Sequence, residues 1–153
     1  MPDEKPAVQG GQRPIKRPVA MEPLRFGIDI DGTISQAPRH FKRLIDALLS
    51  RDDKVYIVTG RLEDRRRDTQ ELLDCLGIRY TELVMRPSDW QSTVAEYKAK
   101  VVQEKGIHLM IDDDETNCWT IEQQTPALAA HMLPIPEMPE AREARAELRK
   151  KKK

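Results

Sequence analysis

The chain has little of the residue types that mark several common classes of protein. It contains only two cysteines, Cys75 and Cys118, and no CxxC pair, which argues against a disulfide scaffold or a zinc site. No apolar run approaches membrane-spanning length, and the first residues lack the hydrophobic segment of a signal peptide. Aromatic residues make up 5% of the chain, so a core has to consist mostly of Ile, Leu, Val and Met. These absences predict a soluble, cytoplasmic protein with no membrane partner.

Charge is balanced over the whole chain but not along it, with 26 basic and 26 acidic residues among 153. Residues 1–23 are rich in Pro, Gly and charge without an apolar period, which predicts a disordered basic, Pro-rich arm. Residues 134–153 begin Pro-rich and continue as Ala, Glu and Arg with a lysine tip, which predicts a charged tail, partly helical, that is either solvated or in contact with a polyanion. The mildly acidic segment between them, residues 24–133, has the length of one domain.

Short apolar runs alternate with helical patterns through this central segment. The runs cover 24–30, 54–60, 80–86, 107–113 and 127–133, and the helical patterns cover 40–51, 62–77, 92–106 and 114–124. Such alternation predicts an α/β fold, a Rossmann-like three-layer sandwich with a five-stranded parallel sheet covered on both faces. Ligands in such sheets bind beyond the C-terminal ends of the strands.

Helical spacing also predicts which side chains face the core. On the first two helices these are Leu44, Ile45, Leu48, Leu49, Leu72, Leu73, Cys75 and Leu76. Gly77 and Gly106 stand where helices end with a glycine cap.

Polar residues follow four of the predicted strands, all at the same edge of the sheet. They are Asp29, Asp31, Gly32 and Thr33 after the first strand, Thr59, Gly60 and Arg61 after the second, Arg86 after the third, and Asp112, Asp113 and Asp114 after the fourth. Any one of these aspartates alone is also suited to capping a helix. Four polar strand ends at one edge predict a functional site.

The aspartates at this edge predict a magnesium ion. Carboxylates crowded together repel one another, and some stay protonated unless a cation compensates them. Oxygen ligands without a His or Cys cluster favour Mg²⁺. Magnesium beside a carboxylate suits phosphoryl transfer, in which an aspartate can also be the nucleophile.

Such a site also needs a cation that holds the nucleophile and the phosphoryl oxygens, and two lysines compete for this role. Lys98 shares a helix face with the apolar residues Val94, Val101 and Val102, whereas Lys100 lies on the polar face. Helical geometry therefore predicts that Lys98 points inward and Lys100 outward.

The motifs "DIDGT", "VTGR" and "IDDD", with an inward lysine between the last two, resemble those of the haloacid dehalogenase (HAD) superfamily of phosphotransferases. The resemblance covers residues 24–133. It implies a nucleophile at Asp29 and a general acid and base at Asp31, whose carbonyl oxygen also binds magnesium. It further implies a phosphate-binding hydroxyl at Thr59, the lysine of the third motif at Lys98, and metal-binding acids at Asp112 and Asp113, while Asp114 is expected to cap the next helix. The metal set is then Asp29, Asp31, Asp112 and Asp113.

The spacing of these motifs leaves no room for the inserted cap domain of larger superfamily members, so a capless, open site is expected. The segment "VYIVTGRLEDRRRDTQELLDCLGIRYTELVMRPSD" is similar to the phosphatase domain of phage-type polynucleotide kinase-phosphatase. That similarity implies a 3′-phosphate on a polynucleotide end as substrate, bound by Gly32, Thr33, Gly60, Arg61 and Arg86. No GxxxxGK[ST] motif occurs, so the kinase half is not expected in this sequence.

The function predicted from the sequence is therefore a magnesium-dependent phosphomonoester hydrolase, acting through an aspartyl-phosphate on nucleic-acid ends. The alternatives are a nucleotidase or other small-molecule phosphatase and, from another class, an inactive nucleic-acid-associated binding module.

Overall fold

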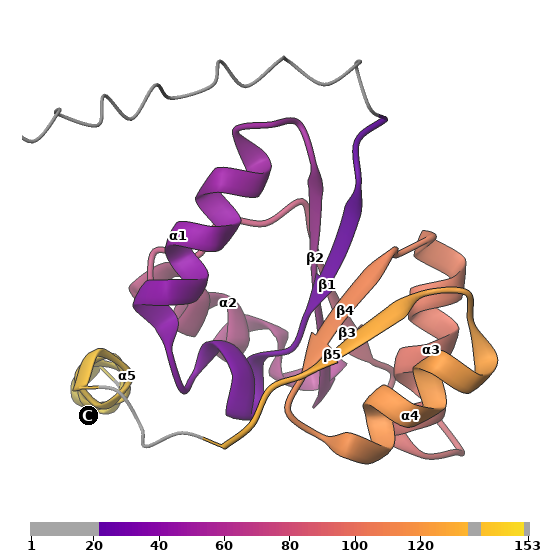
Figure 1. Ribbon diagram of the computed structural model, residues 1–153. Helices are drawn as coiled ribbons and strands as arrows, with labels where there is room; N and C mark the ends of the chain where they lie inside the picture. Colours follow the sequence, from indigo (N-terminus) through magenta and orange to yellow (C-terminus); the bar gives the residue numbers. More distant parts are fainter. Residues whose placement is uncertain (1–21, 135–138, 152–153) are drawn as a thin grey trace, which may run out of the picture.

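The computed structural model describes residues 22–134 and 139–151 and shows a sheet between two layers of helices (Figure 1). The strands are β1 (Arg25–Ile28), β2 (Lys54–Leu62), β3 (Glu82–Arg86), β4 (Leu109–Asp112) and β5 (Leu128–His131). The helices are α1 (Pro38–Leu49), α2 (Arg66–Cys75), α3 (Val94–Lys105), α4 (Glu115–Gln124) and α5 (Pro139–Lys151), with short helical turns η1 (Ile30–Ile34) and η2 (Glu63–Arg65). The predicted disordered arm, residues 1–23, lies almost entirely outside the described residues.

The five strands are all parallel and lie in the order β3-β2-β1-β4-β5. This confirms the predicted Rossmann-like three-layer α/β architecture. From β1 the chain moves to β2 and β3 on one side, and it returns to β4 and β5 on the other side. The direction of winding therefore reverses between β1 and β4, where sheets of this kind form a crevice at the C-terminal ends of their strands.

Each face of the sheet has its own hydrophobic core. Helices α1 and α2 cover one face and bury Phe41, Ile45 and Leu73 against β1 and β2. Helices α3 and α4 cover the other face and bury Val102 and Ile121 against Val58, Met110 and their neighbours. Nearly all of these buried side chains are aliphatic, as the scarcity of aromatic residues requires.

Two of the predicted core positions are wrong. Leu44 is 40% exposed, because the apolar face of α1 is centred on Phe41 and Ile45 and Leu44 lies about 100° around the helix from Ile45. Cys75, the last residue of α2, is also exposed. The predicted glycine ends of two helices are confirmed. Gly106 caps α3 in the left-handed conformation, and Gly77, one residue after the cap of α2, adopts the same conformation.

Helix α5 lies outside the three layers, beside α1 and α2 (Figure 1). It buries Ala141 and Ala144 and packs Leu148 against the core on that side of the sheet. The C-terminal segment thus has a narrow apolar face, and the boundary predicted at residue 134 stays a prediction. Within the described residues, no helix combines the length and the apolar character needed to cross a membrane.

Candidate active site

The site lies at the C-terminal ends of β1 and β4, where two aspartates are neighbours across the sheet. Ile28 pairs with Ile111, and the Asp29 N–H donates to the Ile111 carbonyl at 3.0 Å. One step further along both strands, the register brings Asp29 beside Asp112 on the same face. Both carboxylates are buried, with 4% and 0% of each residue exposed. Burial of two adjacent carboxylates is costly unless a cation compensates them.

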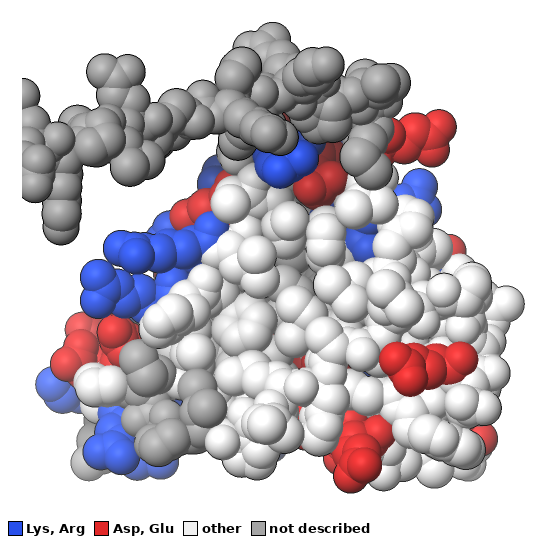
Figure 2. Space-filling view, viewed as in Figure 1, with Lys and Arg blue, Asp and Glu red and all other residues white. Residues whose placement is uncertain are grey.

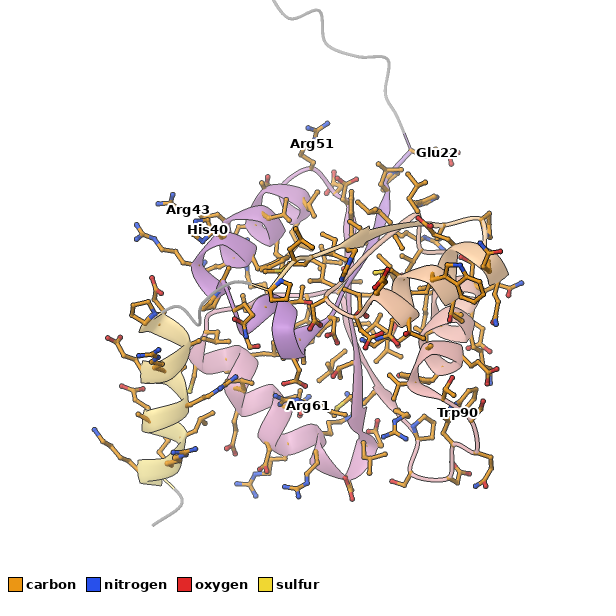
Figure 3. The ribbon with its side chains drawn as sticks, turned by 60° about the horizontal axis from the view of Figure 1, so that its bottom comes forward. Glu22, His40, Arg43, Arg51, Arg61 and Trp90 are labelled. Carbon is orange, nitrogen blue, oxygen red and sulfur yellow. The ribbon has the colours of Figure 1, made fainter. Side chains whose placement is uncertain are left out.

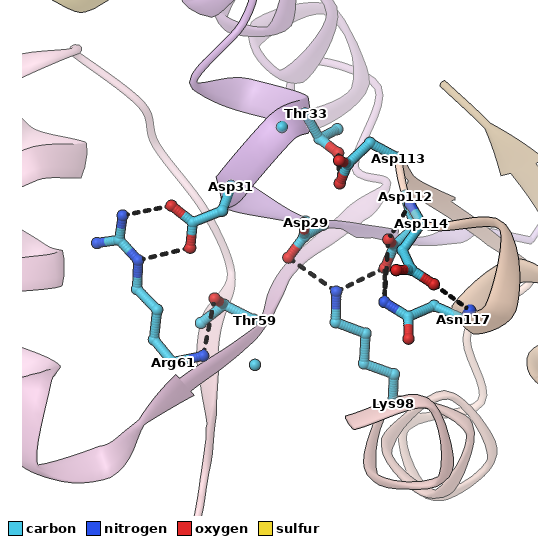
Figure 4. Close-up of polar contacts among 12 residues, drawn as sticks. Asp29, Asp31, Thr33, Thr59, Arg61, Lys98, Asp112, Asp113, Asp114 and Asn117 are labelled. Atoms are coloured by element: carbon cyan, nitrogen blue, oxygen red, sulfur yellow. Dashed lines mark hydrogen bonds and ion pairs between the residues drawn. The ribbon is translucent and has the colours of Figure 1, made fainter. Parts of the chain in front are cut away.

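Lys98 of α3 supplies that compensation (Figure 4). Its Nζ lies 2.9 Å from Asp29 Oδ1 and 2.6 Å from Asp112 Oδ2. The residue is only 2% exposed, whereas the side chain of Lys100 is 56% exposed and pairs with Glu104. The prediction that Lys98 points inward and Lys100 outward is confirmed.

The electrostatics of this group favour a shared proton or an added cation. Burial raises the pKa of Asp29 to about 7, with Lys98 opposing the rise and the Asp112 carboxylate adding to it. Burial disfavours the charge on Lys98, but Asp29 and Asp112 outweigh it and hold the pKa of Lys98 above its ordinary value. One ammonium therefore does not fully compensate the two carboxylates.

Asp112 is held by more donors than the sequence suggested. Its Oδ1 accepts from the Asp114 N–H at 3.0 Å and from Asn117 Nδ2 at 3.2 Å, while Asn117 Nδ2 also lies 3.3 Å from Oδ2. Asp114 caps α4 as predicted, since its side chain accepts from the Asn117 N–H at 2.9 Å. Asn117 was missed from the sequence, although its position three residues after the cap places it on the first turn of α4, facing the end of β4.

Asp113 completes the acidic group from the next position along the chain. Its Oδ1 lies 3.4 Å from the Thr33 hydroxyl, and its carbonyl contacts Nε2 of His131 at 3.0 Å. Gly32 makes this approach possible, because it has a φ of +78° and a Cβ there would fall 2.0 Å from Asp113 Oδ2. The glycine of the "DGT" motif thus leaves the space that the Asp113 carboxylate occupies.

Asp29, Asp112 and Asp113 fit a divalent cation. Each offers a carboxylate oxygen, and these oxygens all lie within 4.8 Å of one another. Three carboxylates against the single charge of Lys98 leave an excess negative charge that a divalent ion would balance. A set made only of oxygen ligands suits Mg²⁺ better than the softer transition metals.

Asp31 lies on the opposite side of Asp29 from Lys98 and is bound by Arg61 (Figure 4). Arg61 Nε donates to Asp31 Oδ2 at 2.8 Å, and Nη2 donates to Oδ1 at 2.6 Å. Burial alone would raise the pKa of Asp31, but the hydrogen bonds and charge of Arg61 hold it below the ordinary 3.8. Arg61 Nη1 also lies 3.4 Å from the buried Thr69 hydroxyl of α2, a support that the sequence did not reveal.

Thr59 and Gly60 end the regular pairing of β2 next to these groups. Thr59 is fully buried, and its Oγ1 accepts from the Arg61 N–H at 3.2 Å, so the hydroxyl supports the irregular last part of β2, which carries Arg61. The register between β2 and β3 shifts after Thr59. Arg86 Nε donates to the Gly60 carbonyl at 2.9 Å, a contact with the backbone of β2 rather than with the aspartates. The structure therefore brings together Asp29, Asp31, Thr59, Arg61 and Lys98 with Asp112 and Asp113 at the end of β4, and Arg86 lies at the margin.

Comparisons with known proteins support the fold. No family model matches the chain, and no curated protein matches it in sequence. One solved chain from the Pnkp1/Rnl/Hen1 RNA repair complex is similar, with a TM-score of 0.64 and 17% identity over 73% of this chain. A second chain, from another structure of the Pnkp1/Rnl/Hen1 complex, has a TM-score of 0.59 and 18% identity over 76% of this chain. This protein corresponds to less than half of each of those chains, 43% and 49%. At such identity the similarity shows a shared fold.

Proposed function

We propose that this protein is a magnesium-dependent phosphomonoester hydrolase of the haloacid dehalogenase type, and that it removes 3′-phosphates from polynucleotide ends. The observation that carries this proposal is the setting of Asp29. It is a buried carboxylate at the C-terminal end of β1, paired with a buried lysine 2.9 Å away, with a second aspartate two residues further along the chain. A structural role alone does not require so many buried charges at the end of a central strand.

In the proposed reaction, a carboxylate oxygen of Asp29 attacks the phosphorus atom of the substrate. A bond between that oxygen and phosphorus forms, the bond from phosphorus to the leaving oxygen breaks, and Asp31 gives its proton to the leaving oxygen. A water molecule then attacks the aspartyl-phosphate while Asp31 accepts its proton. The bond between phosphorus and Asp29 breaks, and phosphate and the original carboxylate result.

Lys98 and the remaining acids prepare Asp29 for this step. Lys98 fixes one oxygen of Asp29 and favours its ionised form, and Asp112 with Asn117 and Asp114 fixes Lys98. A magnesium ion bound by Asp29, Asp113 and the carbonyl oxygen of Asp31 would neutralise charge on the phosphoryl group. Asp112 was also predicted to bind the metal. Both of its carboxylate oxygens already accept hydrogen bonds, so we assign it mainly to orienting Lys98.

Arg61 has two partners in this proposal, one before and one after the substrate binds. In the structure it holds Asp31 as a carboxylate through two hydrogen bonds, a form that cannot donate a proton. Two oxygens of the phosphoryl group of a bound substrate can accept the same pair of hydrogen bonds from Arg61. When Arg61 turns to the substrate, Asp31 loses the contact that keeps its pKa low and is able to take up a proton. Thr59, Gly32, Thr33 and Gly60 would complete the phosphate site, with Arg86 further out.

Two observations support a polynucleotide substrate. Only α1 separates η1 from β2, and only η2, α2 and β3 separate Thr59 from the start of α3, so no cap domain is inserted there. A site without a cap leaves room for the end of a long chain. The similar fold in chains of an RNA repair complex also fits nucleic-acid ends. Against this stands the mildly acidic body of the chain, which favours a small-molecule phosphatase such as a nucleotidase as the second candidate.

Phosphate release from a matched set of substrates tests the proposal. The set contains 3′- and 5′-phosphorylated DNA and RNA oligonucleotides, 3′- and 5′-mononucleotides, sugar phosphates and a chromogenic phosphate ester, each with magnesium and with EDTA. We expect the highest kcat/KM for the 3′-phosphorylated oligonucleotides and no turnover in EDTA, with Asp29→Asn as the inactive control. Preference for mononucleotides would establish the nucleotidase instead. No release from any substrate would favour the inactive binding module.

A further inference from the structure

Helix α5 carries its charges in two separate rows. Ala141, Ala144 and Leu148 form its buried face. At 100° per residue, one flank of this face carries the glutamates and the other carries the arginines. The glutamates are Glu140, Glu143 and Glu147, and the arginines are Arg142, Arg145 and Arg149. Such segregation gives the two sides of the helix opposite charge.

The glutamate flank faces α1. All three glutamates line a hollow of about 320 Å³ together with Arg39 and Lys42 of α1. The two walls of this hollow carry opposite charge, which favours this side of α5 facing α1. Figure 2 shows Lys and Arg side chains gathered along the side of the molecule formed by α1 and α5.

The arginine flank faces α2 and the candidate active site. Arg145 and Arg149 line a second hollow of about 220 Å³ together with Arg61, Leu72 and Leu148. Figure 3 shows α5 alongside α2, with Arg61 toward the sheet. Arg61 is the residue that binds Asp31, and Arg145 is close enough to act electrostatically on the same carboxylate. The hollow therefore adjoins the proposed phosphate site.

We propose that Arg145 and Arg149 of α5 bind the sugar-phosphate backbone of the substrate strand next to its terminal phosphate. This inference rests on the proposed function and assigns the element that selects a polynucleotide. The hollow is smaller than the roughly 300–1,000 Å³ of sites that enclose a whole small molecule, so it suits one backbone unit of a strand that passes across it. Guanidinium groups bind phosphate through paired hydrogen bonds, and Leu72 and Leu148 offer an apolar wall to the sugar.

Asp68 and Glu71 of α2 also line this hollow. Three arginines against two carboxylates leave the lining with an excess of positive charge, and the two carboxylates also form ion pairs with Arg65 and Arg67. A mononucleotide would reach the aspartates and Arg61 without touching α5, whereas a strand would reach both. In a site without a cap domain, α5 then supplies the contacts that distinguish the two kinds of substrate.

Binding of a product strand tests this without any turnover. The probes are short single-stranded DNA and RNA oligonucleotides with a 3′-hydroxyl, measured by fluorescence anisotropy over a salt series. For Arg145→Ala/Arg149→Ala in the full chain, we expect roughly tenfold weaker binding at low salt, as for the loss of two surface ion pairs. The plot of log K against log salt should become less steep, with the magnitude of its negative slope reduced by about 0.7 for each arginine, or about 1.4 for both. Lys150→Ala removes a single positive charge from the outer face of α5 and is the matched control for the single variants Arg145→Ala and Arg149→Ala; it should leave both quantities unchanged.

If the alanine variant unfolds, Arg145→Lys/Arg149→Lys replaces it, because this variant keeps both positive charges. It should bind with intermediate affinity and show an unchanged slope of log K against log salt. In parallel, the ratio of kcat/KM for a 3′-phosphorylated oligonucleotide to that for a small ester should fall in the alanine variant. Equal binding by wild type and the alanine variant, an equal loss in Lys150→Ala, or no oligonucleotide binding by the wild type would each overturn the inference. Binding through α5 without phosphate release from any substrate would uphold it and refute the proposed function.

Discussion

Replacement of Asp29 by asparagine tests both the proposed nucleophile and the electrostatics of the buried group formed by Asp29, Lys98 and Asp112. Asparagine has nearly the shape of aspartate but no negative charge and no nucleophilic oxygen. Lys98 keeps its 2.6 Å contact with Asp112, so the variant does not leave a buried ammonium without a partner. We therefore expect an intact fold, lost turnover and a changed dependence of stability on pH.

The sign and size of the stability change follow from the pKa of Asp29, which burial raises from 3.8 to about 7. Below pH 4 the carboxyl is protonated in the folded and unfolded chain, and this group contributes no difference. Between pH 4 and 7 the unfolded chain loses the proton while the folded chain keeps it, so wild-type stability falls as pH rises. Above pH 7 the penalty is complete and amounts to about 4 kcal/mol at most, from 1.36 kcal/mol per pKa unit.

The assay is urea unfolding of wild type and Asp29→Asn in EDTA at pH 5 and pH 8, with the exposed Asp89→Asn as the control for charge removal. The variant should be more stable than wild type at pH 8 by up to about 4 kcal/mol, and the difference should shrink markedly at pH 5. An equal difference at both pH values, or a less stable variant at pH 8, would refute the assignment of a costly buried carboxylate. Phosphate release at more than about a hundredth of the wild-type rate would refute the nucleophile.

Three further predictions concern the groups around Asp29. Lys98→Ala should lose most activity and about 3–5 kcal/mol of stability, because it leaves two buried carboxylates without their cation. Lys100→Ala should lose less than about 1 kcal/mol of stability and little activity. Kinetics and urea unfolding of the two variants would show whether the inward lysine was identified correctly. Arg61→Ala should raise the pKa of Asp31, since burial then acts without the opposing guanidinium, and carbon-13 NMR titration of the Asp31 carboxyl measures it; an unchanged midpoint would contradict the pairing. Magnesium at about a hundred times its Kd should stabilise the wild type by about 2.7 kcal/mol at pH 8. Asp113→Asn should abolish most of this gain, whereas Asp114→Asn, which keeps a capping residue, should retain it. Thermal unfolding with and without magnesium distinguishes the two variants.

Local patterns in the sequence were enough to predict the architecture, the inward direction of one lysine and one helix cap. The alternation of apolar runs with helical patterns predicted five parallel strands between helices, and the structure confirms it. The spacing of Val94, Val101 and Val102 was enough to direct Lys98 inward, because the 3.6-residue period of a helix is a local property. The same reasoning identified Asp114 as the cap of α4. It failed at Leu44 and Cys75, which lie at the edge of an apolar face, where the period leaves burial undecided.

Contacts between distant segments depended on the tertiary structure. Asp29 and Asp112 become neighbours only because the strand order places β4 beside β1 in one particular register. Arg61 reaches Asp31, thirty residues earlier, only because β2 lies on the other side of β1. Asn117 binds Asp112 because α4 begins directly at the end of β4. Helix α5 is amphipathic over only three small or aliphatic positions, too few to show in the sequence which part of the domain they cover. Local periodicity determines which residues are buried or capped, but strand order, register and helix docking determine which of them meet.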